Sequence, residues 1–102
     1  MEYKTITPQT AKEMIDHEKV TIVDVREEEE YAAMHIPGSI LLPLGTITQA
    51  AAESLKDLDE KILVYCRSGK RSAAACEQLE KMGYQNVYNF GGILDWPYEI
   101  NR

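Results

Sequence analysis

Apolar residues follow two alternating patterns along this chain. Continuous, mostly β-branched apolar runs, typical of strands buried on both faces, occur at positions 20–25 and 62–65. Shorter β-prone runs lie at 3–6, 39–42 and 86–90. The segments between these runs carry apolar residues at helical spacing. This alternation predicts an α/β fold built on a mostly parallel sheet that is flanked by helices.

The expected helices have recognisable starts and faces. Thr7 supplies a helix cap, and Pro8 suits the first helical position. The acidic run at 27–30 is interpreted as the charged first turn of a short helix rather than as a metal site. An amphipathic pattern begins after Thr46, and a last helix is predicted over 72–82.

The most distinctive stretch runs from the strand at 62–65 through a short loop into the last helix. Its loop residues are Cys66, Arg67, Ser68, Gly69, Lys70, Arg71 and Ser72. A helix N-terminus presents free backbone N–H groups and partial positive charge, so a cysteine just ahead of one tends to be a thiolate. The same groups hold an anion nearby, and three cationic side chains add to the attraction. The stretch therefore predicts a nucleophilic Cys66 in an anion-binding loop.

Composition restricts the function classes. With 102 residues the chain is predicted to form one domain, residues 1–102, around a single core. The net charge of −6 argues against a nucleic-acid surface and makes the cations near Cys66 a local exception. Two cysteines without a signal peptide predict reduced thiols in the cytoplasm. No apolar run approaches the roughly 20 residues of a membrane span. We expect neither a metal nor a cofactor.

Two more charged residues are expected at the rim of the site. In a parallel sheet, ligands bind beyond the carboxyl ends of the strands. Asp24 and Cys66 both occupy such an end, so they are expected to share one edge. Asp24 and Arg26 are candidates to polarise this rim, but the favoured interpretation is that they order the loop through hydrogen bonds and a salt bridge, for which Glu30 is a candidate partner.

The remaining candidates have structural interpretations. His35 precedes a proline and a glycine, which favours a residue that fixes a turn over a general acid. Cys76 shares a predicted helix face with Leu79, which favours a small core residue over a resolving thiol. Gly91 and Gly92 are expected to permit close approach of two backbone segments near the site.

Several ordered motifs together resemble one family. They are Asp24-Val25-Arg26, Glu30-Tyr31, His35-Ile36-Pro37-Gly38-Ser39, the loop at 66–72, and Gly91-Gly92 with Trp96. Their order and approximate spacing are similar to those of the rhodanese-like, single-domain sulfurtransferases, over nearly the whole chain. Met34 departs from this pattern, because a glycine is common before the histidine.

The resemblance implies a three-layer α/β/α fold with a mostly parallel five-stranded sheet. It also implies a persulfide on Cys66 and transfer of sulfane sulfur from thiosulfate, or a similar donor, to cyanide or a thiol. A thioredoxin-like protein is one candidate for the thiol acceptor. The backbone N–H groups of residues 67–72 are then expected to cradle the donor's oxygens, with the loop's cations as its attractors.

Other functions remain open from the residues. A cysteine phosphatase or an arsenate reductase also places its cysteine in an anion-binding loop at a helix start. Phosphatases commonly have five residues between cysteine and arginine, whereas four separate Cys66 from Arg71. The shorter loop favours a sulfur atom over a phosphate group. A protein-to-protein sulfur relay or a binding module remains the main alternative to an enzyme that acts on thiosulfate.

Overall fold

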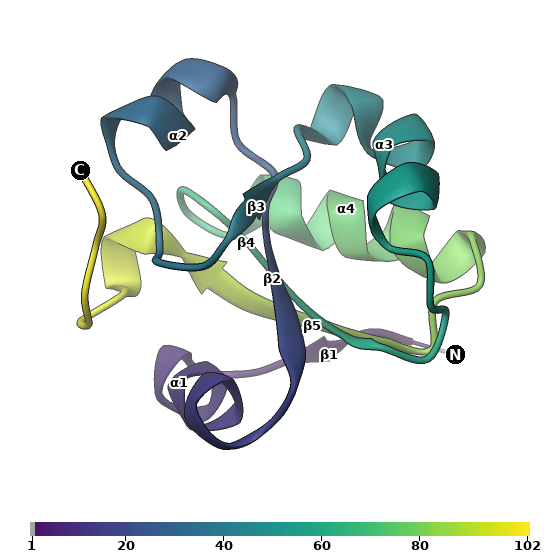
Figure 1. Cartoon of the computed structure of the whole chain (residues 1–102), viewed down its shortest axis with the longest axis horizontal. Helices are drawn as coiled ribbons and strands as arrows, with labels where there is room; N and C mark the ends of the chain where they lie inside the picture. Colours follow the sequence, from purple (N-terminus) through teal and green to yellow (C-terminus); the bar gives the residue numbers. More distant parts are fainter. Residues whose placement is uncertain (1) are drawn as a thin grey trace.

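A five-stranded parallel sheet runs through the middle of the protein in the computed structural model, which describes residues 2–102 (Figure 1). Its strands are β1 (Lys4–Thr5), β2 (Val20–Asp24), β3 (Ile40–Leu41), β4 (Lys61–Cys66) and β5 (Asn86–Gly92). They lie in the order β1-β5-β4-β2-β3, and every neighbouring pair is parallel. The mostly parallel sheet predicted from the apolar pattern is confirmed.

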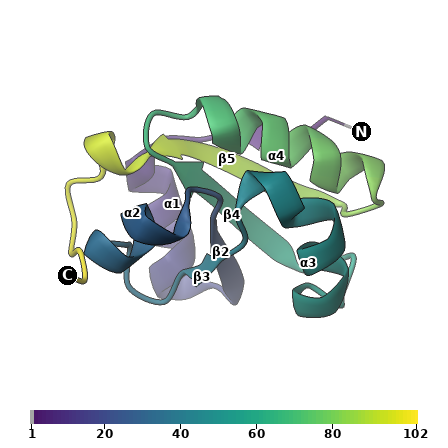
Figure 2. The same ribbon diagram turned by 90° about the horizontal axis from the view of Figure 1, so that it is seen from above.

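Helices cover both faces of this sheet. They are α1 (Pro8–His17), α2 (Glu28–Ala33), α3 (Ile47–Ser54) and α4 (Lys70–Lys81). Figures 1 and 2 show α1 on one face and α3 with α4 on the other. Short 3-10 helices at Leu44–Thr46 and Ile93–Asp95 complete the connections. The result is the three-layer α/β/α arrangement that the sequence led us to expect.

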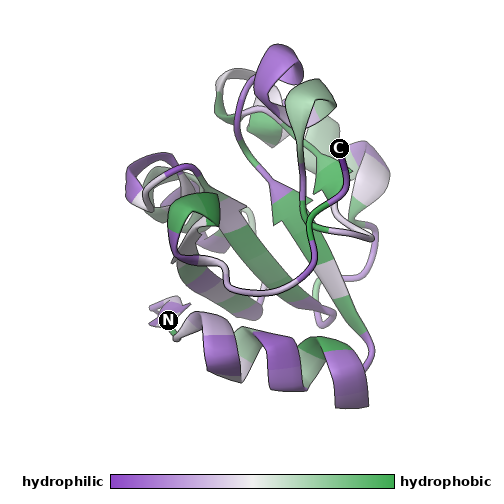
Figure 3. Cartoon of the chain, turned by 90° about the vertical axis from the view of Figure 1, so that its left-hand side faces the viewer, coloured by the Kyte–Doolittle hydropathy of each residue, from purple (hydrophilic) through white to green (hydrophobic). Residues whose placement is uncertain are grey.

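The central strand β4 divides the core into two clusters. Successive side chains of a strand point to opposite faces, so Leu63 and Tyr65 pack on the α1 side. Ile62, Val64 and Cys66 pack on the side of α3 and α4. Figure 3 shows the hydrophobic colouring along the strands. Because β4 is buried on both faces, the position and direction of Cys66 at its end are strongly constrained.

The ends of the first helices agree with the expected local chemistry. The Thr10 N–H donates to Thr7 Oγ1 at 3.0 Å, and Pro8 is the first residue of α1. In α2, the Glu27 side chain accepts from the third helical N–H, while Glu30 accepts from the Glu27 N–H. This reciprocal pair forms a capping box, and it fixes Glu30 at the start of α2.

Two boundaries near the site differ from the prediction. Helix α4 begins at Lys70, not at Ser72, because Gly69 adopts a left-handed φ of 107° and starts the helix earlier. Strand β5 extends to Gly92, not to residue 90, and its register with β4 shifts between Val64 and Cys66. The earlier start of α4 shortens the loop, and the longer β5 places Gly92 beside Cys66.

Candidate functional site

The loop between β4 and α4 lies at the carboxyl edge of the sheet, where the end of β5 also lies (Figures 1 and 2). Cys66 is the last residue of β4, and only residues 67–69 separate it from α4. The side chain of Cys66 is 1% exposed, whereas Arg67, Ser68 and Lys70 are exposed. The cysteine is therefore buried beneath a short loop in which Arg67 and Ser68 are exposed to solvent.

Hydrogen bonds link the sulfur of Cys66 to the loop and to Ser72 in α4. The Gly69 N–H donates to Sγ at 3.0 Å, and Ser72 Oγ lies 3.6 Å from Sγ. Burial raises the pKa of the Cys66 thiol, but the hydrogen bonds from Ser72 and from the loop backbone act in the opposite direction. They prevail, so the pKa lies below its ordinary value. This arrangement favours a thiolate, the form in which cysteine is a nucleophile.

Ser72 is held in place by a residue that the sequence did not single out. Asn89, on β5, accepts a hydrogen bond from Ser72 Oγ at 2.7 Å and one from the Gly91 N–H at 2.9 Å. Ser72 is 0% exposed and Asn89 is 7% exposed. The available signal was an asparagine between Tyr88 and Phe90 in a predicted strand, because a buried amide needs partners. Asn89 thus links the end of β5 to the cysteine loop.

Glycines allow the backbone of β5 to touch the loop. A Cβ added to Gly92 would lie 1.9 Å from the carbonyl oxygen of Arg67 and 2.4 Å from its carbonyl carbon. No side chain fits at such a distance, so the close approach expected from the glycine pair is confirmed at Gly92. The Leu94 N–H then donates to the same Arg67 oxygen at 3.3 Å.

The three loop cations have different surroundings. Arg71 forms a two-pronged ion pair with Glu30, with N–O distances of 2.7 and 3.0 Å. The Arg71 hydrogen bonds lower the pKa of Glu30 to about 2. Arg67 and Lys70 form none of the ion pairs found within residues 2–102. Two loop cations therefore remain for an incoming anion, while Arg71 anchors the loop to α2.

Asp24 and Arg26 form a second ion pair, which is buried. The Arg26 guanidinium donates to Asp24 at 2.7 to 3.1 Å and also to the Met34 carbonyl at 2.7 Å. Asp24 is 0% exposed and Arg26 is 3% exposed. Asp24 and Arg26 thus form their salt bridge with each other. The suggested partner Glu30 was wrong, because its carboxylate pairs with Arg71. The pair ties the end of β2 to the end of α2.

His35 holds the chain after α2. Its Nδ1 lies 2.9 Å from the Tyr31 carbonyl oxygen, and its ring stacks on the Tyr31 ring with centroids 3.9 Å apart. Its backbone exchanges two hydrogen bonds with Asn101. These contacts are those of a residue that fixes a turn. Met34, the departure from the family pattern, has an extended φ of −167°, so this position does not need a glycine.

Cys76 lies in the core beneath the loop. It is 0% exposed and packs in the same apolar cluster as Cys66, and both cysteines are free thiols. Burial raises the pKa of the Cys76 thiol to about 12. The core interpretation of Cys76 agrees with this burial. Of the two thiols, only Cys66 has surroundings that favour the thiolate.

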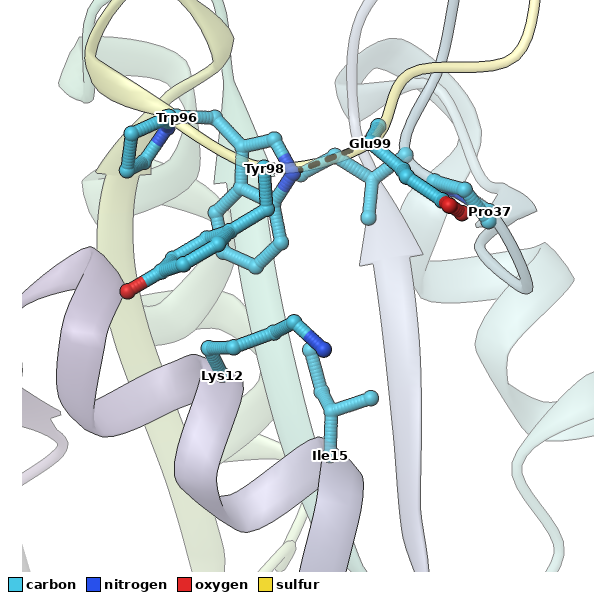
Figure 4. Close-up of a pocket in the computed structure, with 8 residues that line it drawn as sticks. Lys12, Ile15, Pro37, Trp96, Tyr98 and Glu99 are labelled. Carbon is cyan, nitrogen blue, oxygen red and sulfur yellow. Dashed lines mark hydrogen bonds between the residues drawn. The ribbon is translucent and has the colours of Figure 1, made fainter.

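A separate hollow lies away from the loop, between α1 and the C-terminal segment (Figure 4). It is lined by Lys12, Ile15, Ile36, Pro37, Trp96, Pro97, Tyr98 and Glu99. The Trp96 indole N–H donates to the Glu99 carbonyl at 3.1 Å, and the Tyr98 ring meets the indole edge-on. None of the loop residues lines this hollow, so it is not part of the candidate site.

The fold and the loop define a class: an α/β protein with a cysteine at a helix start, cradled by backbone N–H groups. A model of the rhodanese-like domain matches residues 7–98, and the chain belongs to this family. Within residues 2–102, no helix has the length and apolar character that a membrane span requires, and no cluster of three potential metal ligands occurs.

Individual relatives support the family assignment. The YrkF protein of Bacillus subtilis is 41% identical over 93 residues, which cover 89% of this chain and 49% of YrkF. The chain thus spans about half the length of that relative. The thiosulfate sulfurtransferase PspE of Escherichia coli is 38% identical over 73 residues, covering 72% of this chain and 70% of PspE.

The structure of a rhodanese with anions from E. coli superposes with a TM-score of 0.78 at 33% identity. The match covers 82% of this chain and 99% of that one. Sequence and structure comparisons therefore agree on the same family.

Proposed function

We propose that this protein is a sulfurtransferase that carries a sulfane sulfur as a persulfide on Cys66. The donor is thiosulfate or a similar anion, and the acceptor is a thiol or cyanide. The observation that carries the proposal is the cradle around Sγ, in which hydrogen bonds with Ser72 and the Gly69 N–H lower the pKa of the cysteine that ends β4, just before α4. The name of PspE, a thiosulfate sulfurtransferase, supports the choice of donor.

The first half-reaction loads the cysteine. The Cys66 thiolate attacks the outer sulfur of thiosulfate and forms a new S–S bond. The original S–S bond breaks, and its electron pair leaves with sulfite, so the transfer needs no external oxidant. Arg67 and Lys70 attract the dianion, because they are exposed cations without an ion-pair partner within residues 2–102.

The second half-reaction discharges the persulfide. An acceptor thiolate attacks the outer sulfur, and the electron pair of the breaking bond returns to Sγ. Cyanide reacts in the same way and becomes thiocyanate. The loop backbone serves both steps, because its N–H groups stabilise the thiolate as a nucleophile and as a leaving group.

The same geometry weighs against phosphate chemistry. A phosphatase needs a free arginine at the end of the loop to grip the phosphoryl oxygens. Arg71, which stands at that end, is already held by both oxygens of Glu30. The loop also has only four residues between Cys66 and Arg71. A persulfide therefore fits this loop better than a phosphocysteine.

Mass spectrometry of the protein after incubation with thiosulfate tests the proposal. We expect the intact protein to gain one sulfur atom, and the Cys66→Ser variant to gain none. Cys76→Ser is the matched control and should load normally, because Cys76 is buried and its pKa is raised to about 12. Hydrolysis of a phosphate ester without a sulfur adduct would contradict the proposal.

The two free thiols also suit a reducing compartment such as the cytoplasm.

A further inference from the structure

A second hollow lies directly beside the cysteine loop. It is lined by Arg26, Glu30, Ala33, Met34, Arg67, Ile93, Leu94 and Arg102, and we refer to it as the rim hollow. Arg67 belongs to the loop itself, and Leu94 is joined to it by the hydrogen bond to the Arg67 carbonyl. Figures 1 and 2 show α2 and the C-terminal segment on this side of the molecule. A molecule in the rim hollow would therefore lie next to the loop that covers Cys66.

The rim hollow carries excess positive charge. The charge of Arg26 is balanced by Asp24, and that of Glu30 is balanced by Arg71. This leaves the side chains of Arg67 and Arg102, which are both exposed, and Glu30 is the only acidic side chain in the lining. The whole chain has a net charge of −6. A local cationic surface on an acidic protein favours an acidic partner at this place.

The rim hollow also exposes apolar surface. Leu94 is 60% exposed, the highest value among the large hydrophobic side chains exposed within residues 2–102. Ala33 is exposed as well, and Met34 is half-buried. A projecting leucine beside cations is typical of a protein contact, whose apolar centre is surrounded by a polar rim. A small anion such as thiosulfate would use the charges but would gain nothing from Leu94.

We propose that the rim hollow docks the protein that accepts sulfur from Cys66, and that this protein presents acidic and apolar residues around its thiol. The inference rests on the proposed sulfur transfer. Cys66 is 1% exposed, so the acceptor thiolate must approach the outer sulfur past the exposed loop residues beside the rim hollow. It attacks that sulfur, the S–S bond to Sγ breaks, and Sγ keeps the electron pair. Contacts with Leu94 and Arg102 hold the acceptor in place for this step.

The test measures how fast each of three thiols removes the sulfur from the Cys66 persulfide of the loaded protein. They are a blocked cysteine peptide with aspartates and a leucine, its counterpart with lysines in place of the aspartates, and glutathione. We expect the acidic peptide to react roughly fivefold faster than the basic one. This factor is what about one favourable contact between exposed charges contributes. The preference should vanish at about 1 M salt, where the screening length is about 3 Å.

Two variants with matched controls locate the effect. Arg102→Glu should abolish the preference for the acidic peptide, whereas Lys56→Glu, the same charge change between α3 and the start of β4, should preserve it. Leu94→Ala should slow the acidic peptide by roughly threefold to fivefold, the effect of losing part of a leucine contact. Leu58→Ala, which truncates another exposed leucine, should have no such effect.

The outcomes separate the two proposals. If the wild type gains no sulfur from thiosulfate, the proposed function is wrong. If it loads normally but discharges to all three thiols at equal rates, or if Arg102→Glu and Leu94→Ala behave like their controls, the docking proposal is wrong. A third outcome is that Arg102→Glu slows discharge to glutathione and to the acidic peptide equally, while Leu94→Ala slows neither. The rim hollow would then bind a small anionic thiol and not a protein, and the docking proposal would be wrong.

Discussion

Single residues set the distance between β5 and the cysteine loop. Gly92 is the closest case, because any Cβ there would overlap the Arg67 carbonyl, whose oxygen also accepts the Leu94 N–H. Relief of this overlap requires the backbone to move. The movement would displace the loop that surrounds Cys66, and a displacement of about 1 Å can cost catalysis a large factor.

We therefore predict that Gly92→Ala loads sulfur from thiosulfate at least about tenfold more slowly than the wild type. Its stability should fall by roughly 1–3 kcal/mol, the usual cost of overpacking. Loading is measured by mass spectrometry and stability by urea unfolding. Gly45→Ala is the control, because no atom lies within 4 Å of a Cβ added at Gly45. Equal loading by both variants would contradict the importance of this contact.

At the scale of elements, α2 and α4 are joined by the ion pair of Glu30 and Arg71. Glu30 also closes the capping box of α2, so a single carboxylate serves the start of α2 and, through Arg71, the start of α4 after the cysteine loop. Its pKa is lowered from 4.5 to about 2, chiefly by Arg71. The ionised form of Glu30 therefore stabilises the folded protein, fully above about pH 4.5 and less as the pH falls toward 2.

We predict that Glu30→Gln lowers the free energy of unfolding at pH 7 by about 1–2 kcal/mol, a reduced value because the pair is partly exposed. The difference from the wild type should shrink as the pH falls from 4.5 toward 2, which urea unfolding at several pH values would show. Glu28→Gln, an exposed position of the same helix, should have little effect. A difference that stays constant down to pH 2 would refute the role of the ion pair.

At the scale of the whole molecule, the Asp24–Arg26 pair joins the sheet to the segment after α2. Both residues are buried, and Arg26 also holds the Met34 carbonyl. Removal of one partner leaves the other charge buried without compensation, which is far more costly than the loss of an exposed pair.

We predict that Arg26→Leu destabilises the protein by roughly 3–5 kcal/mol, as measured by urea unfolding at pH 7. Lys12→Leu, which removes the exposed i,i+4 partner of Asp16, should cost only about 0.5 kcal/mol or less. The double variant Asp24→Asn/Arg26→Leu should recover part of the loss, since it buries no lone charge. A cost for Arg26→Leu similar to that for Lys12→Leu would show that the pair is not needed for the fold.

The fold and the central cysteine could be predicted because their signals are local. Apolar runs of strand length alternate with helical periodicity, and this alternation is enough to predict a parallel sheet with helices on both faces. Cys66 could be singled out because it stands where a buried strand ends, shortly before a helix begins. The Thr7 cap and the acidic first turn of α2 depend likewise on neighbours within a few residues.

The partners of these residues could not be predicted, because they come from distant parts of the chain. Arg71 meets Glu30 across 41 positions, and Ser72 meets Asn89 across 17. Each contact exists only because the sheet order places β5 and β2 on either side of β4. The start of α4 at Lys70 also depended on the backbone angle of Gly69, which the helical pattern did not reveal.

The sequence by itself thus determined the class of fold, the family resemblance and the cysteine at the end of β4, because strand burial and helix starts are properties of short segments. Only the tertiary structure decided which loop cations stay available to an anion, which residue holds Ser72, and that Leu94 lies beside Arg67. The physical reason is that charge pairing and close backbone contact depend on distance in space, which the order of the strands sets.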